Sequence, residues 1–318
     1  MLEVRNISKF YGDLPGVRNL SFSTEKGEIL GLLGANGAGK TTAMNIITGY
    51  IPPTSGQVLL NGIDLHQSPL EAKKLIGYLP ETPPLYPDLQ VNHFLKFVCE
   101  LKGVPPREIP DHLDEIMESV GLTDVKKRLI KNLSKGYRQR IGLAQALISK
   151  PDFIVLDEPT VGLDPKQIAE VRNLIKNIGG ISTVILSSHI LTEVNLLCDR
   201  VIIIDKGNTV AGDSPANLAD RLFEYDSFFV CVQAPVNVFI SKCQNIEGIT
   251  KITHQETDRI LPDGFNEYVI ENDKSIDVRS PLFRMMAKSD YIAHEIKSID
   301  IGLEDVFFQY TGKGTGNT

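Results

Sequence analysis

The stretch GANGAGKT, residues 34–41, decides the fold class of this chain. It matches the pattern G-x-x-x-x-G-K-[ST], follows the strand-like run Glu28–Leu33 and precedes a helix expected over Thr42–Thr48. Glycines allow such a loop to wrap closely around phosphates, because its backbone N–H groups can then point at the phosphate oxygens. The pattern alone arises by chance in some chains. A strand, this loop and a helix in that order predict a nucleotide-binding site.

Individual residues of the loop have separate expected roles. Lys40 is expected to reach the β- and γ-phosphates, and the hydroxyl of Thr41 is expected to bind Mg²⁺. The positive N-terminal end of the following helix also faces the phosphates. The other residues that we expect to contact the nucleotide in this segment are Gly34, Asn36, Gly37, Ala38, Gly39 and Thr42.

Two acids follow a second apolar strand, Phe153–Leu156. Asp157, at the strand end, is expected to hold Mg²⁺ directly or through water. Glu158 is expected to polarise the attacking water. The alternative is two surface acids at a strand end, which the phosphate loop makes the weaker interpretation.

The chain around these motifs predicts an α/β fold. Apolar runs without clear alternation, typical of strands buried on both faces, predict strands at Ile76–Leu79, Thr183–Ser187 and Arg200–Asp205. Gln57–Leu60 reads as a strand closed by the hairpin turn Asn61-Gly62. A helical insert is expected over about 91–150, with helices at Val91–Leu101 and Asp111–Val120 and a third beginning at Ile141. Strands that alternate with helices favour a mainly parallel sheet.

The 318 residues predict two domains. We expect a nucleotide-binding domain over 1–220 and a small α+β accessory domain over 221–318. In the second domain, strands are expected at Phe228–Val232 and Tyr268–Ile270, and a helix at Pro281–Lys288.

Composition excludes several classes of protein. The net charge is −7 and the chain lacks the basic footprint of a nucleic-acid binder. It contains no apolar stretch of about 20 residues and no signal-peptide core. Its four cysteines show neither metal-site nor disulfide spacing. We therefore expect a cytoplasmic chain that another polypeptide would have to carry to a membrane.

Further motifs resemble those of ABC transporter ATP-binding subunits. Leu133–Gln139, reading LSKGYRQ, looks like the LSGGQ signature of that family, and Val161–Asp164 looks like its D-loop. Ser188-His189 looks like the switch-histidine loop, and Tyr11 lies where the family keeps an aromatic residue that stacks on adenine. The motifs run in the family's order from Tyr11 to His189. This combination is far more specific than any single motif.

The resemblance implies a P-loop NTPase fold with a helical subdomain, an antiparallel β part and the accessory domain. It implies ATP and Mg²⁺ as cofactors, with Glu158, His189 and Lys40 as catalytic residues. It also implies that Ser134, Gly136, Asp164 and Tyr11 contact the nucleotide.

Two departures from the family pattern affect the site. The signature carries Lys135 and Tyr137 at its third and fifth positions but keeps the serine and the fourth-position glycine. Glu81 replaces the glutamine of the loop that reads GYLPE. An ionised carboxylate cannot donate a hydrogen bond, but it can bind Mg²⁺ or order water. The metal-ligand candidates are therefore Thr41, Asp157 and Glu81.

The phrase around GYLPE resembles the ABC-2 type exporter branch, including gliding-motility, drug and polysaccharide export subunits. The resemblance implies a head-to-tail pair with a second copy or a related ATPase subunit, because one chain holds one phosphate loop and one signature. It also implies a separate transmembrane permease and a position at the inner face of the membrane. No nucleic acid is expected as a partner.

Two other functions stay open at this stage. One is a soluble ABC ATPase that acts on nucleic acid or the ribosome, which the acidic tail and the single ATPase domain disfavour. The other is a nucleotide-gated regulator without significant turnover, which Asp157, Glu158 and His189 disfavour. A P-loop kinase or GTPase would not explain the motifs beyond the phosphate loop.

Overall fold

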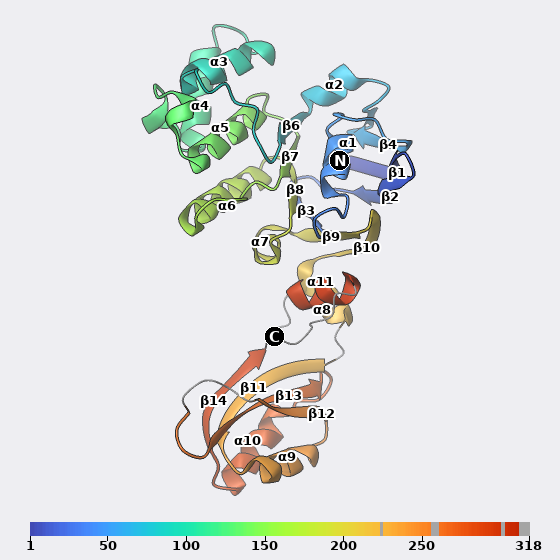
Figure 1. The fold of residues 1–318 in the computed structure, drawn as a ribbon, viewed down its shortest axis with the longest axis vertical. Helices are drawn as coiled ribbons and strands as arrows, with labels where there is room; N and C mark the ends of the chain where they lie inside the picture. The colour runs from blue at the N-terminus through green and yellow to red at the C-terminus, as the bar shows by residue number, and fades with distance from the viewer. Residues whose placement is uncertain (223–224, 256–260, 300–302, 312–318) are drawn as a thin grey trace. The chain divides into compact units, whose positions relative to one another are not determined.

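The computed structural model describes residues 1–222, 225–255, 261–299 and 303–311. The chain divides into two compact units (Figure 1). Of the described residues, the first unit comprises Met1–Pro215 together with Tyr310 and Thr311, and the second lies within Ala216–Gln309.

A six-stranded sheet of order β10-β9-β3-β8-β7-β6 organises the first unit. Every neighbouring pair in it is parallel except β10 with β9, so the predicted mainly parallel sheet is confirmed. All residues of β3, β7 and β8 are buried, as expected for strands covered on both faces. The strands are β3 (Ile29–Leu33), β6 (Ile76–Leu79), β7 (Phe153–Asp157), β8 (Thr183–Ser188), β9 (Arg200–Asp205) and β10 (Asn208–Asp213).

An antiparallel sheet of order β2-β1-β4-β5 forms a second layer of this unit. Its strands are β1 (Leu2–Tyr11), β2 (Leu14–Ser23), β4 (Ser55–Leu60) and β5 (Ile63–Asp64). Asn61 and Gly62 join β4 to β5 with φ of 49° and 82°, which confirms the predicted two-residue hairpin turn.

Helix α1 (Lys40–Ile47) packs between the two sheets. Its buried side chains, among them Met44 and Ile47, join one apolar cluster with Leu2 of the antiparallel sheet and Val155 of the parallel sheet. The phosphate loop precedes this helix directly, so the core of the unit fixes the loop at both of its ends.

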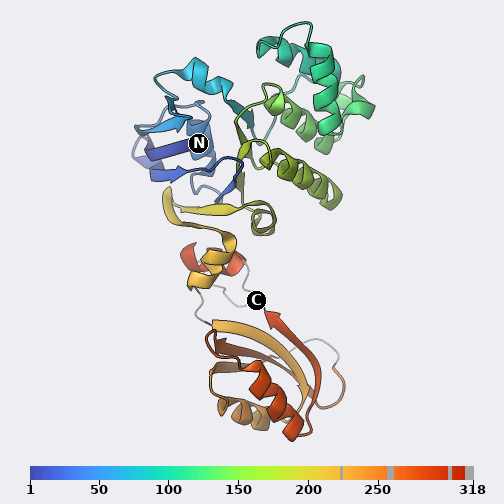
Figure 2. The same cartoon turned by 180° about the vertical axis from the view of Figure 1, so that it is seen from behind.

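The helices of the insert lie on the other side of the parallel sheet from the antiparallel sheet, as Figures 1 and 2 show. One expected boundary is wrong, since α5 begins at Lys135 and not at Ile141. Its first turn is polar, and the Ser134 hydroxyl accepts a hydrogen bond from the Tyr137 N–H, so a side-chain cap rather than apolar spacing starts this helix. The remaining helices of the unit are α2 (Pro69–Lys74), α3 (Val91–Leu101), α4 (Ile109–Ser119), α6 (Pro165–Gly179) and α7 (Leu191–Leu197), with single 3₁₀ turns at Thr123–Val125 and Ile130–Asn132.

The second unit is an antiparallel sheet of order β12-β13-β11-β14 with helices on one face (Figure 2). Phe228, Tyr268 and Ile270 of the sheet pack in one core with Phe239 of α9 and Leu282 of α10. The strands and helices within this unit are β11 (Tyr225–Gln233), α9 (Val236–Gln244), β12 (Ile249–Gln255), β13 (Phe265–Asp273), α10 (Arg279–Lys288) and β14 (Ile292–Ile299), and the helices α8 (Pro215–Leu222) and α11 (Leu303–Thr311) lie across the boundaries of the two units. Within the described residues no helix has the length and apolar character that crossing a bilayer needs.

Candidate functional site

The phosphate loop connects the carboxyl end of β3 to α1. Gly37 and Gly39 have φ of 82° and 113°, a region that L side chains rarely adopt. Gly34 has no room for a side chain, because a Cβ there would lie 2.5 Å from the carbonyl oxygen of Ile204. The Lys40 ammonium donates a hydrogen bond of 2.8 Å to the carbonyl of Gly34. These contacts hold the loop in a tight curve with its lysine turned inward.

A pocket of about 490 Å³ lies along this loop. It brings together loop residues with Gly16 of β2 and with side chains from three segments that the sequence analysis selected, those of Glu81, Glu158 and His189. Its lining residues are Gly16, Ala35, Asn36, Gly37, Gly39, Lys40, Thr41, Thr42, Glu81, Glu158, Val161 and His189.

Glu158 connects two other candidate residues in this pocket. One carboxylate oxygen lies 3.5 Å from the Lys40 ammonium, and the other accepts a 2.8 Å hydrogen bond from Nδ1 of His189. Its backbone has φ of 48°, an unusual conformation for a residue with a side chain. Lys40 and Glu158 are buried, whereas His189 is partly exposed. The three predicted catalytic residues therefore form one connected cluster.

Asp157 lies behind this cluster at the end of β7, and the hydroxyl of Ser187 donates a hydrogen bond to it. The same hydroxyl accepts a 3.0 Å bond from the backbone N–H of Glu158. Burial raises the pKa of Asp157, and the charges of Glu158 and Glu81 raise it further, while the Ser187 bond and Lys40 oppose the shift. A cation beside this carboxylate would relieve that repulsion.

The three metal-ligand candidates are compatible with Mg²⁺. Thr41 and Glu81 line the pocket, and Asp157 is close enough to Glu81 for their charges to interact. The described residues contain no cluster of three His, Cys, Asp or Glu side chains with metal-binding geometry. Mg²⁺ does not require such a cluster, because it usually keeps several waters and binds one or two carboxylates together with substrate phosphates.

Tyr11 lies at the edge of the same region, at the end of β1. A Cβ at Gly16 would lie 2.9 Å from the Tyr11 ring and 3.1 Å from the Thr42 methyl group, so the ring lies beside the loop segment. The Tyr11 side chain is about half exposed, and the Lys9 ammonium lies 5.8 Å from its centroid. An exposed ring beside the pocket is available for stacking.

Seven candidate residues do not line this pocket: Tyr11, Gly34, Ala38 and Asp157, which lie in or beside the segments already described, and Ser134, Gly136 and Asp164. Ser134 caps α5, and the Asp164 carboxylate caps α6 by accepting a 2.9 Å bond from the Gln167 N–H. Gly136 packs against the side chain of Gln167, which would lie 2.7 Å from a Cβ at that position. The helix cap at Asp164 follows from the Asp-Pro sequence at the start of α6. A direct role for these residues in nucleotide binding stays a prediction.

The sequence motifs gave no separate role at this site to Gly16, Ala35 or Ser187, and they gave Val161 only as part of the D-loop. Gly16 and Val161 line the pocket but carry no chemical signal of their own. Ser187 connects Asp157 to Glu158, and a buried hydroxyl at the end of the apolar strand β8 could have indicated it.

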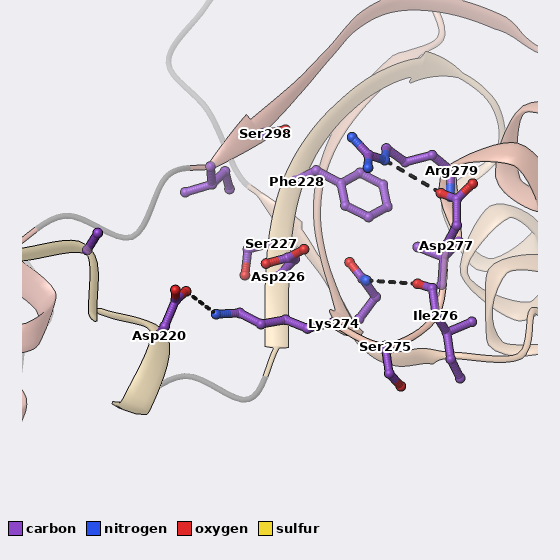
Figure 3. A pocket seen from close by; sticks show the side chains of 14 residues that line it. Asp220, Asp226, Ser227, Phe228, Lys274, Ser275, Ile276, Asp277, Arg279 and Ser298 are labelled. Atoms are coloured by element: carbon purple, nitrogen blue, oxygen red, sulfur yellow. Dashed lines mark hydrogen bonds and ion pairs between the residues drawn. The ribbon is translucent and has the colours of Figure 1, made fainter. Parts of the chain in front are cut away.

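A pocket of about 590 Å³ in the second unit has different chemistry (Figure 3). Its cationic groups already have acidic partners, since Lys274 lies 3.0 Å from Asp220 and Arg279 lies 3.6 Å from Asp277. None of the predicted site residues lines it.

Comparisons with known proteins agree with the geometry of the first unit. Residues 17–161 match the family model described as ABC transporter. The chain is 35% identical over 257 residues to the linearmycin resistance ATP-binding protein LnrL of Bacillus subtilis, covering 80% of this chain and 83% of that protein. It is 31% identical to the bacitracin transport ATP-binding protein BcrA of Bacillus licheniformis, covering 99% and 98% of the two chains. A solved structure of the ATP-binding subunit of an ABC transporter aligns with a TM-score of 0.64 at 27% identity, over 70% of this chain and 92% of that chain.

Proposed function

Because this chain belongs to the family of ABC transporter ATP-binding proteins, we propose that it is the ATP-hydrolysing subunit of an ABC-2 type exporter. It acts as a pair around two ATP molecules and drives a separate transmembrane permease at the inner face of the membrane. The observation that carries this proposal is the contact of Lys40, Glu158 and His189 beside the phosphate loop.

The loop supplies the binding part of the reaction. Its backbone N–H groups surround the phosphates, and Lys40 moves from the Gly34 carbonyl to the phosphate oxygens. Phosphoryl transfer requires little covalent chemistry from the protein, so positioning and neutralisation of charge supply most of the rate. Tyr11 stacks on the adenine ring at the outer edge of this region.

Glu158 and His189 act on the attacking water. The Glu158 carboxylate accepts a hydrogen bond from the water, and the His189 ring keeps that carboxylate oriented by a bond of 2.8 Å. His189 is partly exposed on the pocket side, where it also reaches the γ-phosphate.

Thr41, Asp157 and Glu81 would hold Mg²⁺ in this site. When bound, the ion neutralises the developing phosphate charge and orients the β- and γ-oxygens. Glu81 adds a negative charge that a glutamine would not, which favours a cation at this position.

Ser134 and Gly136 lie outside the pocket of their own chain, which supports a role toward the nucleotide of a second copy. A head-to-tail pair with two-fold symmetry gives each nucleotide one loop and one signature. Contacts to the γ-phosphate then hold the two copies together, and their loss after hydrolysis lets the pair open.

A groove of about 460 Å³ is a suitable surface for the permease. It lies between the segment Glu81–Pro87 that follows β6 and the start of α5, with Pro83, Leu85 and Ile130 among its apolar lining residues. Glu81 lines both the groove and the nucleotide pocket, so a movement of the groove residues also moves a side chain of the pocket. The names of the two relatives, which refer to linearmycin resistance and bacitracin transport, support a role in transport of, or resistance to, a compound of that kind.

Steady-state phosphate release from ATP tests this function. The wild-type chain should release phosphate, and Glu158→Gln should bind ATP equally well but release phosphate about 10²-fold more slowly or worse, the scale of a lost general base. Lys40→Ala should instead weaken ATP binding. The proposal would be contradicted if Glu158→Gln released phosphate as fast as the wild-type chain. It would also be contradicted if the wild-type chain bound ATP but released no phosphate.

A further inference from the structure

Glu193 is a buried carboxylate that the mechanism above does not use. It lies in the first turn of α7 and is 6% exposed. The hydroxyl of Thr160 donates a hydrogen bond to Oε2, while Oε1 is buried without a hydrogen-bond partner. Burying a carboxylate is unfavourable unless its hydrogen bonds compensate, so its presence at this position calls for a physical reason.

Thr160 lies in the segment that begins with Glu158. It is 1% exposed, and successive turns surround it, because the Val161 N–H donates to the Glu158 carbonyl at 3.3 Å and the Leu163 N–H donates to the Thr160 carbonyl at 3.2 Å. The position of the Thr160 side chain is therefore tied to the backbone that carries Glu158.

Glu193 lies in the segment that begins with His189. The N–H groups of Glu193 and Val194 both donate to the Ile190 carbonyl, at 3.2 and 3.3 Å, and fix the first turn of α7 directly after the histidine. Two side-chain hydrogen bonds thus join the same two segments, one from His189 to Glu158 and one from Thr160 to Glu193. The two bonds and the two short pieces of backbone form a closed ring.

We propose that Glu193 is a positioning residue for ATP hydrolysis, which holds α7 against the Glu158 segment through Thr160 and so keeps His189 within hydrogen-bond distance of Glu158. The inference rests on the proposed function, since it concerns the geometry of the same catalytic pair. Without the bond between Thr160 and Glu193, only the bond between His189 and Glu158 would join the two segments, and that bond must change during turnover.

The hydrogen bond to Thr160 does not require a charge on Glu193. Burial raises the pKa of Glu193 and the nearby Glu158 raises it further, whereas the Thr160 bond, Arg172 of α6 and His189 lower it. A carboxyl oxygen accepts from the Thr160 hydroxyl in either protonation state. An amide oxygen can accept in the same way, so a glutamine at position 193 should keep the hydrogen bond from the Thr160 hydroxyl.

Six variants of the full chain separate positioning from general stability. Thr160→Val and Glu193→Leu each remove the bond, and the double variant removes both partners. Thr160→Ser and Glu193→Gln each keep a donor or an acceptor in place. Thr183→Val is the matched control, because it also removes a buried threonine hydroxyl. That hydroxyl donates at 3.0 Å to the Glu25 carbonyl, and Thr183 lies at the start of β8, whereas His189 follows the end of that strand.

Phosphate release is measured at several ATP concentrations to separate kcat from KM, together with the melting temperature of each variant. Thr160→Val and Glu193→Leu should lower kcat about 10- to 100-fold, the scale of a small misplacement of catalytic groups, with KM changed less than about twofold. The double variant should be no slower than the slower single variant. The kcat of Thr160→Ser and of Glu193→Gln should stay within about threefold of the wild-type value. The corresponding increase in activation free energy is then less than half of that expected for Thr160→Val and Glu193→Leu.

Three results would overturn the inference: a kcat of Thr160→Val equal to that of Thr183→Val, losses that multiply in the double variant, or a Glu193→Gln as slow as Glu193→Leu. The comparison of Glu193→Gln with Glu193→Leu stands even if Thr160→Val is unstable, and the comparison of Thr160→Val with Thr183→Val stands even if Glu193→Leu is unstable. A wild-type chain without turnover would instead refute the proposed function itself, which distinguishes the two failures.

Discussion

Asp157 is a single residue whose burial opposes folding. Burial raises its pKa above the ordinary value of 3.8, so the native state binds a proton more readily than the unfolded chain. By linkage, stability falls as the pH rises from the ordinary pKa of the aspartate through its raised value in the folded chain. Above the raised pKa, Asp157 is charged in the folded chain, and the burial of this charge then lowers the stability by its full amount.

Asp157→Asn should therefore raise the melting temperature of the nucleotide-free chain at pH 7.5. The gain should shrink as the pH falls through the raised pKa of Asp157, because the wild-type carboxyl then becomes protonated in the folded state. The same variant should lose phosphate release, because an amide is a poor Mg²⁺ ligand. Thermal unfolding monitored by circular dichroism across this pH range measures the effect. A lower melting temperature of the variant at pH 7.5 would show that the Ser187 bond outweighs the burial of the charge.

Tyr11 permits a second test at the residue scale. If its half-exposed ring stacks on adenine, Tyr11→Ala should weaken ATP binding by about 1–3 kcal/mol, the scale of base–aromatic stacking. Titration in the Glu158→Gln background measures binding without hydrolysis. Tyr11→Phe keeps the ring and should bind like the parent. Equal affinities of the alanine and phenylalanine variants would remove Tyr11 from the site.

Residue patterns predicted some contacts in this pocket and missed others for a physical reason. The loop, Glu81, Glu158 and His189 carry motif signals, and the structure brings them to one pocket. Ser187 and Thr160 act by hydrogen bonds to residues on other segments, and such contacts depend on how strands and helices pack. A single serine or threonine in an apolar stretch carries only a weak sign of them.

At the scale of elements, the parallel strands and the helix Val91–Leu101 follow directly from apolar patterning, and their bounds agree with it. The pattern of apolar residues did not predict the hairpin of β1 and β2. Its register shifts several times, and Asn6 and Asn19 have φ of 50° and 47°, so apolar and polar residues do not alternate along it. Irregular strands hide the period that sequence analysis depends on.

The contact between β6 and α5 permits a test at this scale. A Cβ at Gly77 of β6 would lie 2.2 Å from the carbonyl oxygen of Ala146 in α5, which is backbone and cannot rotate away. Gly77→Ala should therefore separate the helix from the strand and lower the free energy of unfolding by about 1–3 kcal/mol, as overpacking does. Chemical denaturation measures this change.

Gly212→Ala is the matched control for Gly77→Ala. Gly212 lies in the edge strand β10, and the nearest atom to its Cβ position is 3.6 Å away, an ordinary contact. The control should unfold like the wild-type chain. Equal stability of both variants would mean that the helix and strand tolerate separation.

At the scale of the whole molecule, the net charge of −7 argues against a strongly basic nucleic-acid binder and the length of 318 residues predicts two domains, but neither quantity indicates the chemistry. The second unit illustrates this limit. Its antiparallel sheet and helices form their own core, and its 590 Å³ pocket contains paired charges without a catalytic constellation. Within the described residues, the candidate catalytic residues Lys40, Glu158 and His189 lie close together after strands of one sheet.

Because the signature residues Ser134 and Gly136 lie outside the nucleotide pocket of their own chain, ATP is expected to join two copies of the chain. The mass of Glu158→Gln, measured by sedimentation with and without ATP and Mg²⁺, tests it most directly. ATP should convert the 35.2 kDa chain to twice that mass, with one ATP bound per chain. Ser134→Asp in the same background keeps a good helix cap but adds a negative charge, so it should bind ATP and stay monomeric. A Glu158→Gln chain that binds ATP as a monomer, or a Ser134→Asp chain that doubles in mass, would contradict the account.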